Sequence, residues 1–120
     1  MDGNNRWSKK KNFDLTKGYT SGAYKLIKIT THIFKNYDVK YVSAFALSKN
    51  NLNRSKIIIS TIKNVLLDFL NKYEENYNFD FKIKFIGDLN FLNKNIRNKI
   101  KIIENKNLSS KNNLIILINY

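Results

Sequence analysis

The first seven residues hold the side chains best suited to chemistry on a phosphate. They read MDGNNRW, which predicts a short polar loop leading towards a helix. Gly3 lets backbone N–H groups approach anionic oxygens, and Arg6 offers a planar fork of donors. Asp2 is suited to Mg²⁺, a hard cation that prefers carboxylate and phosphate oxygens. An ordinary solvated Asx turn would have the same residues, so the loop alone leaves both interpretations open.

Apolar and amphipathic segments alternate behind this loop and predict an α/β fold. Apolar residues recur at helical spacing over residues 21–35, 55–73 and 92–103, which favours three helices. Buried strands are expected at Val39–Leu47, Phe81–Ile86 and Leu114–Ile118. Strands that alternate with helices pair in parallel through right-handed βαβ units. We therefore expect a mostly parallel sheet with helices on both faces.

The strong positive charge suggests a polyanionic partner. The formal net charge is +13 and the sequence pI is about 9.9, which fits nucleic acid, anionic lipid or phosphorylated substrates. Codon bias is an alternative explanation, because AT-rich codons encode the abundant Lys, Asn and Ile. A basic nucleic-acid-binding module therefore stays an alternative function, although the aromatic residues mostly lie on apolar stripes.

The amino-acid composition also indicates in which cellular compartment the protein is expected. The chain has no cysteine, which excludes disulfides and thiolate metal sites and fits a reducing, cytoplasmic compartment. Residues 1–11 are polar and basic and lack the apolar centre of a secretory signal. The longest apolar runs are too short to cross a bilayer.

Five blocks in order make the chain resemble the cis-prenyltransferases, the family of undecaprenyl diphosphate synthase. Residues 1–10 are similar to the family's opening signature, with its Lys pair. Gly18, Gly22 and Ala23 match a Gly-His-x-x-Gly-Ala stretch. The remaining blocks lie at residues 46–54, 85–89 and 117–120. The resemblance covers the whole chain but only the front half of a family member.

The resemblance implies an isoprenyl transferase that joins isopentenyl diphosphate to an allylic diphosphate such as farnesyl diphosphate, with Mg²⁺ as cofactor. It implies catalytic roles for Asp2, the Mg²⁺ ligand, and for Asn51, placed to assist proton removal. The positions that it implies for substrate binding are Gly3, Asn4, Asn5, Arg6, Trp7, Ser48, Lys49, Asn50 and Arg54. It also implies isoprenoid diphosphates, a homodimer partner or a complete family member as partners, and peripheral contact with a membrane through the lipid product.

Several positions depart from the family pattern. Asn5 stands where the family has a glycine, and we expect it to preserve the turn because Asn tolerates positive φ. Leu15 and Tyr19 replace an Arg and a His that contact the diphosphate, so binding should be weaker. Asn50 replaces a Glu of the second block. His32, the only histidine, matches no family site and is expected to be structural.

The resemblance also predicts where the prenyl chain would lie. The family's apolar cleft falls between the strand carrying Ala44 and Ala46 and the helix carrying Ile58, Ile62 and Val65. These aliphatic side chains equally suit a plain core.

We interpret residues 1–120 as a partial cis-prenyltransferase domain. The family's strand before the opening signature, and its C-terminal half with the isopentenyl-diphosphate site, have no counterpart here. The isolated chain is therefore expected to be inactive. Three interpretations stay open: a fragment of a longer gene, a decayed gene, or a retained non-catalytic partner of a complete enzyme.

Overall fold

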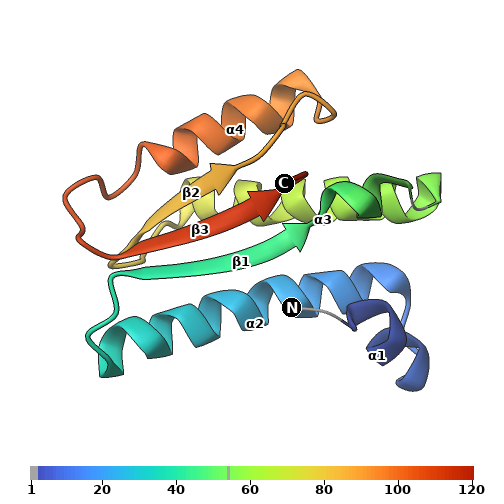
Figure 1. Cartoon of the computed structure of the whole chain (residues 1–120), viewed down its shortest axis with the longest axis horizontal. Helices are drawn as coiled ribbons and strands as arrows, with labels where there is room; N and C mark the ends of the chain where they lie inside the picture. Colours follow the sequence, from blue (N-terminus) through green and yellow to red (C-terminus); the bar gives the residue numbers. More distant parts are fainter. Residues whose placement is uncertain (1–2, 54) are drawn as a thin grey trace.

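Helices and strands alternate along the chain in the computed structural model, which describes residues 3–53 and 55–120 (Figure 1). The elements are α1 (Asn4–Lys10), α2 (Leu15–Asn36), β1 (Tyr41–Leu47), the short 3₁₀ helix η1 (Lys49–Asn53), α3 (Lys56–Glu75), β2 (Lys82–Ile86), α4 (Lys94–Glu104) and β3 (Asn113–Ile118). Each strand lies within two residues of its predicted bounds.

The three strands form one parallel sheet with the order β1-β3-β2. Leu114 at the centre is paired with Val42 on one side and Ile83 on the other. The central strand is the most apolar, as expected for a strand with neighbours on both sides. The predicted α/β fold with a parallel sheet is thus confirmed.

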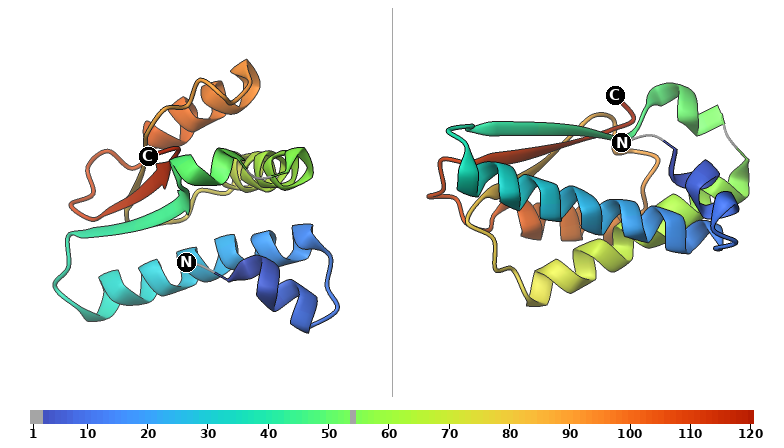
Figure 2. Two further views of the ribbon diagram at one scale, coloured as in Figure 1. Left: turned by 45° about the vertical axis from the view of Figure 1, so that its right-hand side comes forward. Right: turned by 90° about the horizontal axis from the view of Figure 1, so that it is seen from below.

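The three long helices α2, α3 and α4 lie on one face of the sheet, as the right-hand view of Figure 2 shows. On β2 the residues Ile83 and Phe85 point into this helical layer and are buried. On the opposite face, Tyr41 and Phe45 of β1 remain 66% and 53% exposed. We expected helices on both faces of the sheet. Within residues 3–53 and 55–120, the long helices lie on one face.

Side-chain caps fix where the helices begin. Asp14 accepts a hydrogen bond from the backbone of Lys17 at 2.7 Å, so α2 starts six residues before the predicted segment. Asn93 caps α4 in the same way. None of the described helices combines the length and the apolarity that crossing a bilayer requires.

The expected N-terminal loop is shorter than predicted. Among the described residues only Gly3 precedes the helix, with φ +87° and ψ 0°, and residues 4–10 are helical. The prediction of a loop through residue 7 was therefore wrong. Residues 4–10 have no apolar periodicity that would predict a helix. The close contact of this short helix with α2 stabilises it instead.

Candidate functional site

Two glycines let α1 lie directly against α2. A Cβ on Gly18 would lie 1.7 Å from the Ser8 Oγ, and one on Gly22 would lie 2.9 Å from the Asn4 side-chain amide. The buried Ser8 hydroxyl also donates a hydrogen bond to the Asn4 carbonyl at 2.8 Å. The four-residue spacing of these glycines puts both on one face of α2. This contact positions the first residues of α1.

The start of α1 presents the residues that the sequence predicted for diphosphate binding. The positive φ of Gly3 favours glycine, and its carbonyl accepts a hydrogen bond from the Trp7 backbone at 2.8 Å. Asn5 is helical and is not among the residues with positive φ, so the turn does not use the tolerance of Asn for positive φ by which we expected it to be preserved. The Trp7 ring is 42% exposed and packs edge-on against Phe13. Asp2 lies outside the described residues.

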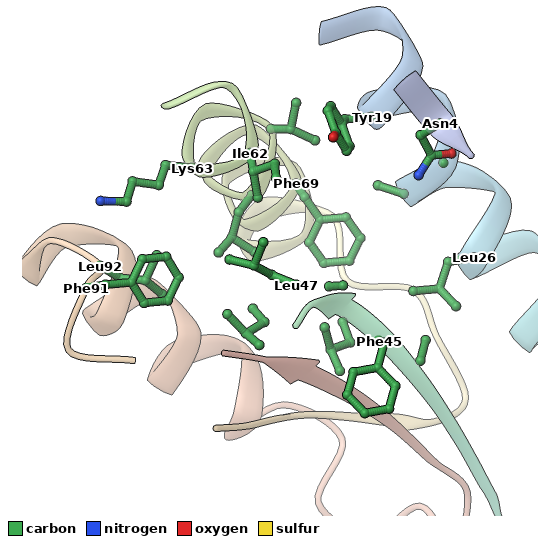
Figure 3. A pocket seen from close by; sticks show the side chains of 18 residues that line it. Asn4, Tyr19, Leu26, Phe45, Leu47, Ile62, Lys63, Phe69, Phe91 and Leu92 are labelled. Atoms are coloured by element: carbon green, nitrogen blue, oxygen red, sulfur yellow. The ribbon is translucent and has the colours of Figure 1, made fainter. Parts of the chain in front are cut away.

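An apolar pocket of about 120 Å³ opens beside this helix, between α2, α3 and the sheet (Figure 3). Its apolar wall includes Ala23 and Leu26 of α2, Ala44 and Ala46 of β1, and Ile62, Val65 and Phe69 of α3. The cleft predicted from Ala44, Ala46, Ile62 and Val65 is therefore present. Ile58 is not among the residues that line it.

Few polar side chains border the pocket. Asn4 of α1 and Tyr19 of α2 lie on the same side of it in Figure 3. The ammonium group of Lys63 points away from the pocket, 5.3 Å from the centroid of the Phe91 ring. The pocket therefore has one polar border, formed by α1 and the start of α2, and is otherwise apolar. Such a site suits a molecule with a polar head and a hydrocarbon tail.

The second predicted block follows the carboxyl end of β1. The backbone of Lys49 donates to the Tyr120 carbonyl at 3.3 Å, and Asn119 donates to the Leu47 carbonyl at 2.6 Å. Ser48 is half-buried, whereas Lys49 and Asn50 are exposed, and none of these three lines the pocket. Asn51 lies in η1, but its side chain and all of Arg54 lie outside what the structure describes.

The sequence did not identify several residues that line the pocket. Leu26, Leu66 and Phe69 belong to the apolar stripes from which we predicted helices, and Phe91 received no assignment. Helical periodicity shows which side chains point inward, but a pocket wall and a filled core produce the same pattern. The structure also places His32 on the exposed face of α2 next to Asn36, away from the pocket.

No group of three or more His, Cys, Asp or Glu side chains gathers within the described part of the chain in a way that could hold a metal ion. A Mg²⁺ ion commonly uses one or two carboxylates together with substrate phosphates. A single carboxylate at Asp2 is compatible with that arrangement.

The comparisons with known proteins agree with the fold and the sequence blocks. A family model for undecaprenyl diphosphate synthases matches residues 1–120. The chain is 36% identical over 110 residues to the dehydrodolichyl diphosphate synthase complex subunit SRT1 of Saccharomyces cerevisiae, covering 87% of this chain and 32% of that protein. It is 32% identical to an isoprenyl transferase of Campylobacter jejuni, covering 88% of this chain and 48% of that protein.

A solved structure shows the same fold. Lavandulyl diphosphate synthase from Lavandula x intermedia, crystallised with dimethylallyl diphosphate, superposes with a TM-score of 0.83 at 24% identity. The match covers 100% of this chain and 52% of that one. The chain thus spans about half the length of its bacterial relative and about a third of the yeast protein. Because the family model matches its whole length, this chain belongs to the undecaprenyl diphosphate synthase family of cis-prenyltransferases.

Proposed function

We propose that this chain forms the allylic-diphosphate half of a cis-prenyltransferase site. The reaction would condense isopentenyl diphosphate with an allylic diphosphate such as farnesyl diphosphate. The observation that carries the proposal is the apolar pocket whose polar border includes Asn4, at the start of α1. The hydrocarbon chain would occupy the pocket and the diphosphate would lie at residues 3–6.

The chemistry explains why cationic donors belong at the start of α1. When an allylic diphosphate ionises, negative charge develops on the departing group, and preset donors stabilise that charge. Arg6 is exposed and offers several N–H donors in one plane. The close contact of α1 with Gly18 and Gly22 fixes the position of the helix that carries Arg6.

Mg²⁺ would be held by Asp2 together with diphosphate oxygens. Bound there, the ion would supply further charge neutralisation to the leaving diphosphate. The neighbouring residues of the chain keep their own roles: Gly3 turns the backbone, Arg6 binds the diphosphate, and the pocket excludes water from the prenyl chain.

We propose that the isolated chain does not catalyse prenyl transfer. It spans about half of the bacterial relative, and from the resemblance we expect the isopentenyl-diphosphate site in the other half. A complete family member, or a polypeptide supplying that half, would be the partner; the yeast relative is named as a subunit of a complex. We place the chain in the cytoplasm, where both diphosphate substrates would be accessible.

Two measurements on the purified 120-residue chain test these statements separately. Calorimetric titration with farnesyl diphosphate and Mg²⁺ should show saturable binding, and its absence would remove the basis of the proposed site. Incorporation of radiolabelled isopentenyl diphosphate in the presence of farnesyl diphosphate should yield no polyprenyl product. Product formation would refute the claim that the chain is inactive alone.

A further inference from the structure

The α1–α2 hairpin concentrates the positive charge of the molecule. Residues 3–37 contain eight Lys and Arg side chains and one acid, Asp14. The Asp14 carboxylate already accepts the capping hydrogen bond of α2. The hairpin therefore carries seven of the thirteen net positive charges in fewer than a third of the residues.

Six of these eight cations lie on the outward surface of the hairpin. On α2, the exposed lysines recur at spacings that keep them on one helical stripe. They are Lys17, Lys25, Lys28 and Lys35. The buried side chains Ile27 and Thr30 lie on the opposite side of α2, and Gly18 and Gly22 face α1. On α1, Ser8 points to α2 while Lys9 and Lys10 are exposed.

Apolar side chains are interspersed with these cations. Trp7, Tyr24 and Ile29 are 42%, 45% and 44% exposed. A surface with Lys on a helical face and with Trp, Tyr and aliphatic side chains between them is typical of contact with the headgroup region of a bilayer. Lysines attract anionic headgroups, and the amphipathic rings lie at the boundary between water and acyl chains.

We propose that the outward surface of the α1–α2 hairpin docks on an anionic lipid bilayer. Nucleic acid fits this surface less well, because bases bind to proteins by stacking on open aromatic faces. The Lys72 Nζ of α3 lies 4.3 Å from the centroid of the Tyr24 ring and covers one of its faces, and the Trp7 ring forms a T-shaped contact with Phe13. These contacts limit stacking of a base on either ring, whereas the exposed parts of both rings can still lie among lipid headgroups. Ile29 has no ring on which a base could stack, but it can enter a lipid surface.

The position of α2 supplies a second argument, which rests on the proposed function. The same helix borders the apolar pocket through Ala23 and Leu26, so the docked surface and the prenyl site are parts of one rigid element. A bilayer held against α2 would lie close to the place where a hydrophobic product forms.

Vesicle flotation of the purified chain tests the proposal. Binding is expected to mixed phosphatidylcholine and phosphatidylglycerol vesicles, to weaken with added salt, and to be far weaker with phosphatidylcholine alone. The variant K25E/K28E/K35E should lose about a hundredfold or more in partitioning. The matched control K94E/K101E/K111E changes the net charge equally at exposed sites on α4 and the following loop, and should retain binding.

A second variant tests the apolar contribution. Ile29→Ser keeps every charge and should weaken vesicle binding several-fold without changing salt sensitivity. An equal loss of vesicle binding in the two triple variants would overturn the proposal. Binding to neutral vesicles that is as strong as binding to anionic vesicles would also overturn it. So would tight, salt-sensitive binding to random single-stranded DNA by a chain that leaves the vesicles unbound. Farnesyl diphosphate titration of the same variants should be unchanged, which separates failure of this proposal from failure of the proposed function.

Discussion

At the scale of single residues, the close contact of Ser8 with Gly18 is the first point of the account to test. Gly18→Ala in a helix interior normally stabilises by about 0.5–1 kcal/mol. Here the added methyl would meet the Ser8 hydroxyl at 1.7 Å, so we expect destabilisation of about 1–3 kcal/mol from overpacking. Urea unfolding measures it. The double variant Ser8→Gly/Gly18→Ala should recover part of the loss, and a more stable Gly18→Ala chain would show that α1 does not pack there.

Arg6 is the residue on which diphosphate binding should depend most. Losing a charge-assisted hydrogen bond costs roughly 1.5–3 kcal/mol, so Arg6→Ala should weaken farnesyl diphosphate binding by about tenfold to a hundredfold. His32→Ala should change nothing, because His32 lies on the exposed side of α2. Lys25→Ala controls for net charge at a remote exposed site. Calorimetry measures the change in affinity, and undiminished binding by Arg6→Ala would show that the start of α1 is not the diphosphate site.

At the scale of elements, Glu104 joins α4 to the edge strand β2. Its carboxylate accepts a hydrogen bond from the backbone of Phe85 at 2.8 Å. Glu104→Ala leaves that partly buried N–H without its partner, and we expect a loss of about 1–3 kcal/mol in the free energy of unfolding. Glu104→Gln keeps an acceptor oxygen and should lose less. Equal losses in denaturant unfolding would mean that the hydrogen bond contributes nothing measurable.

The connection between α3 and β2 should make stability fall at high pH. Burial raises the pKa of Tyr77 to about 12, and its hydroxyl donates to the Phe81 carbonyl at 2.6 Å. The folded chain therefore holds this proton more tightly than the unfolded chain, whose tyrosine pKa is about 10. The stabilisation is complete below pH about 10 and is lost as pH rises towards 12. Tyr77→Phe should remove this part of the pH dependence in unfolding titrations monitored by circular dichroism.

The elements were largely predictable because their signals are local. The strand at residues 39–47 was recognised from its β-branched and aromatic residues, the strand at 81–86 from its period-two alternation, and the helix that begins near Ser55 from its apolar spacing. The short helix α1 was not, because its stability depends on Gly18 and Gly22 of the next helix. The apolar periodicity of one helix does not show which other helix it contacts.

The candidate site was predictable to a smaller degree. The pocket walls formed by Ala44, Ala46, Ile62 and Val65 followed from the resemblance. Phe69 and Leu26 could not be assigned to a pocket, because inward-facing residues repeat in the same way whether they fill space or leave it. The roles expected for Asp2, Asn51 and Arg54 stay predictions.

At the scale of the whole molecule, the sheet has one covered and one open face. Parallel sheets are generally covered on both faces, and here Tyr41 and Phe45 are largely exposed. The right-hand view of Figure 2 shows all three long helices on the other side. The chain spans about half the length of the Campylobacter jejuni relative.

The central claim is that one ligand joins the start of α1 to the apolar pocket. The most direct measurement is an NMR titration of the isotopically labelled chain with farnesyl diphosphate and Mg²⁺, following backbone amides and side-chain methyl groups together. The amides of Gly3 and Arg6 and the methyl groups of Leu26 and Val65 should shift with one common dissociation constant. Shifts confined to the exposed lysine surface of α2, with the pocket methyl groups unchanged, would contradict the account.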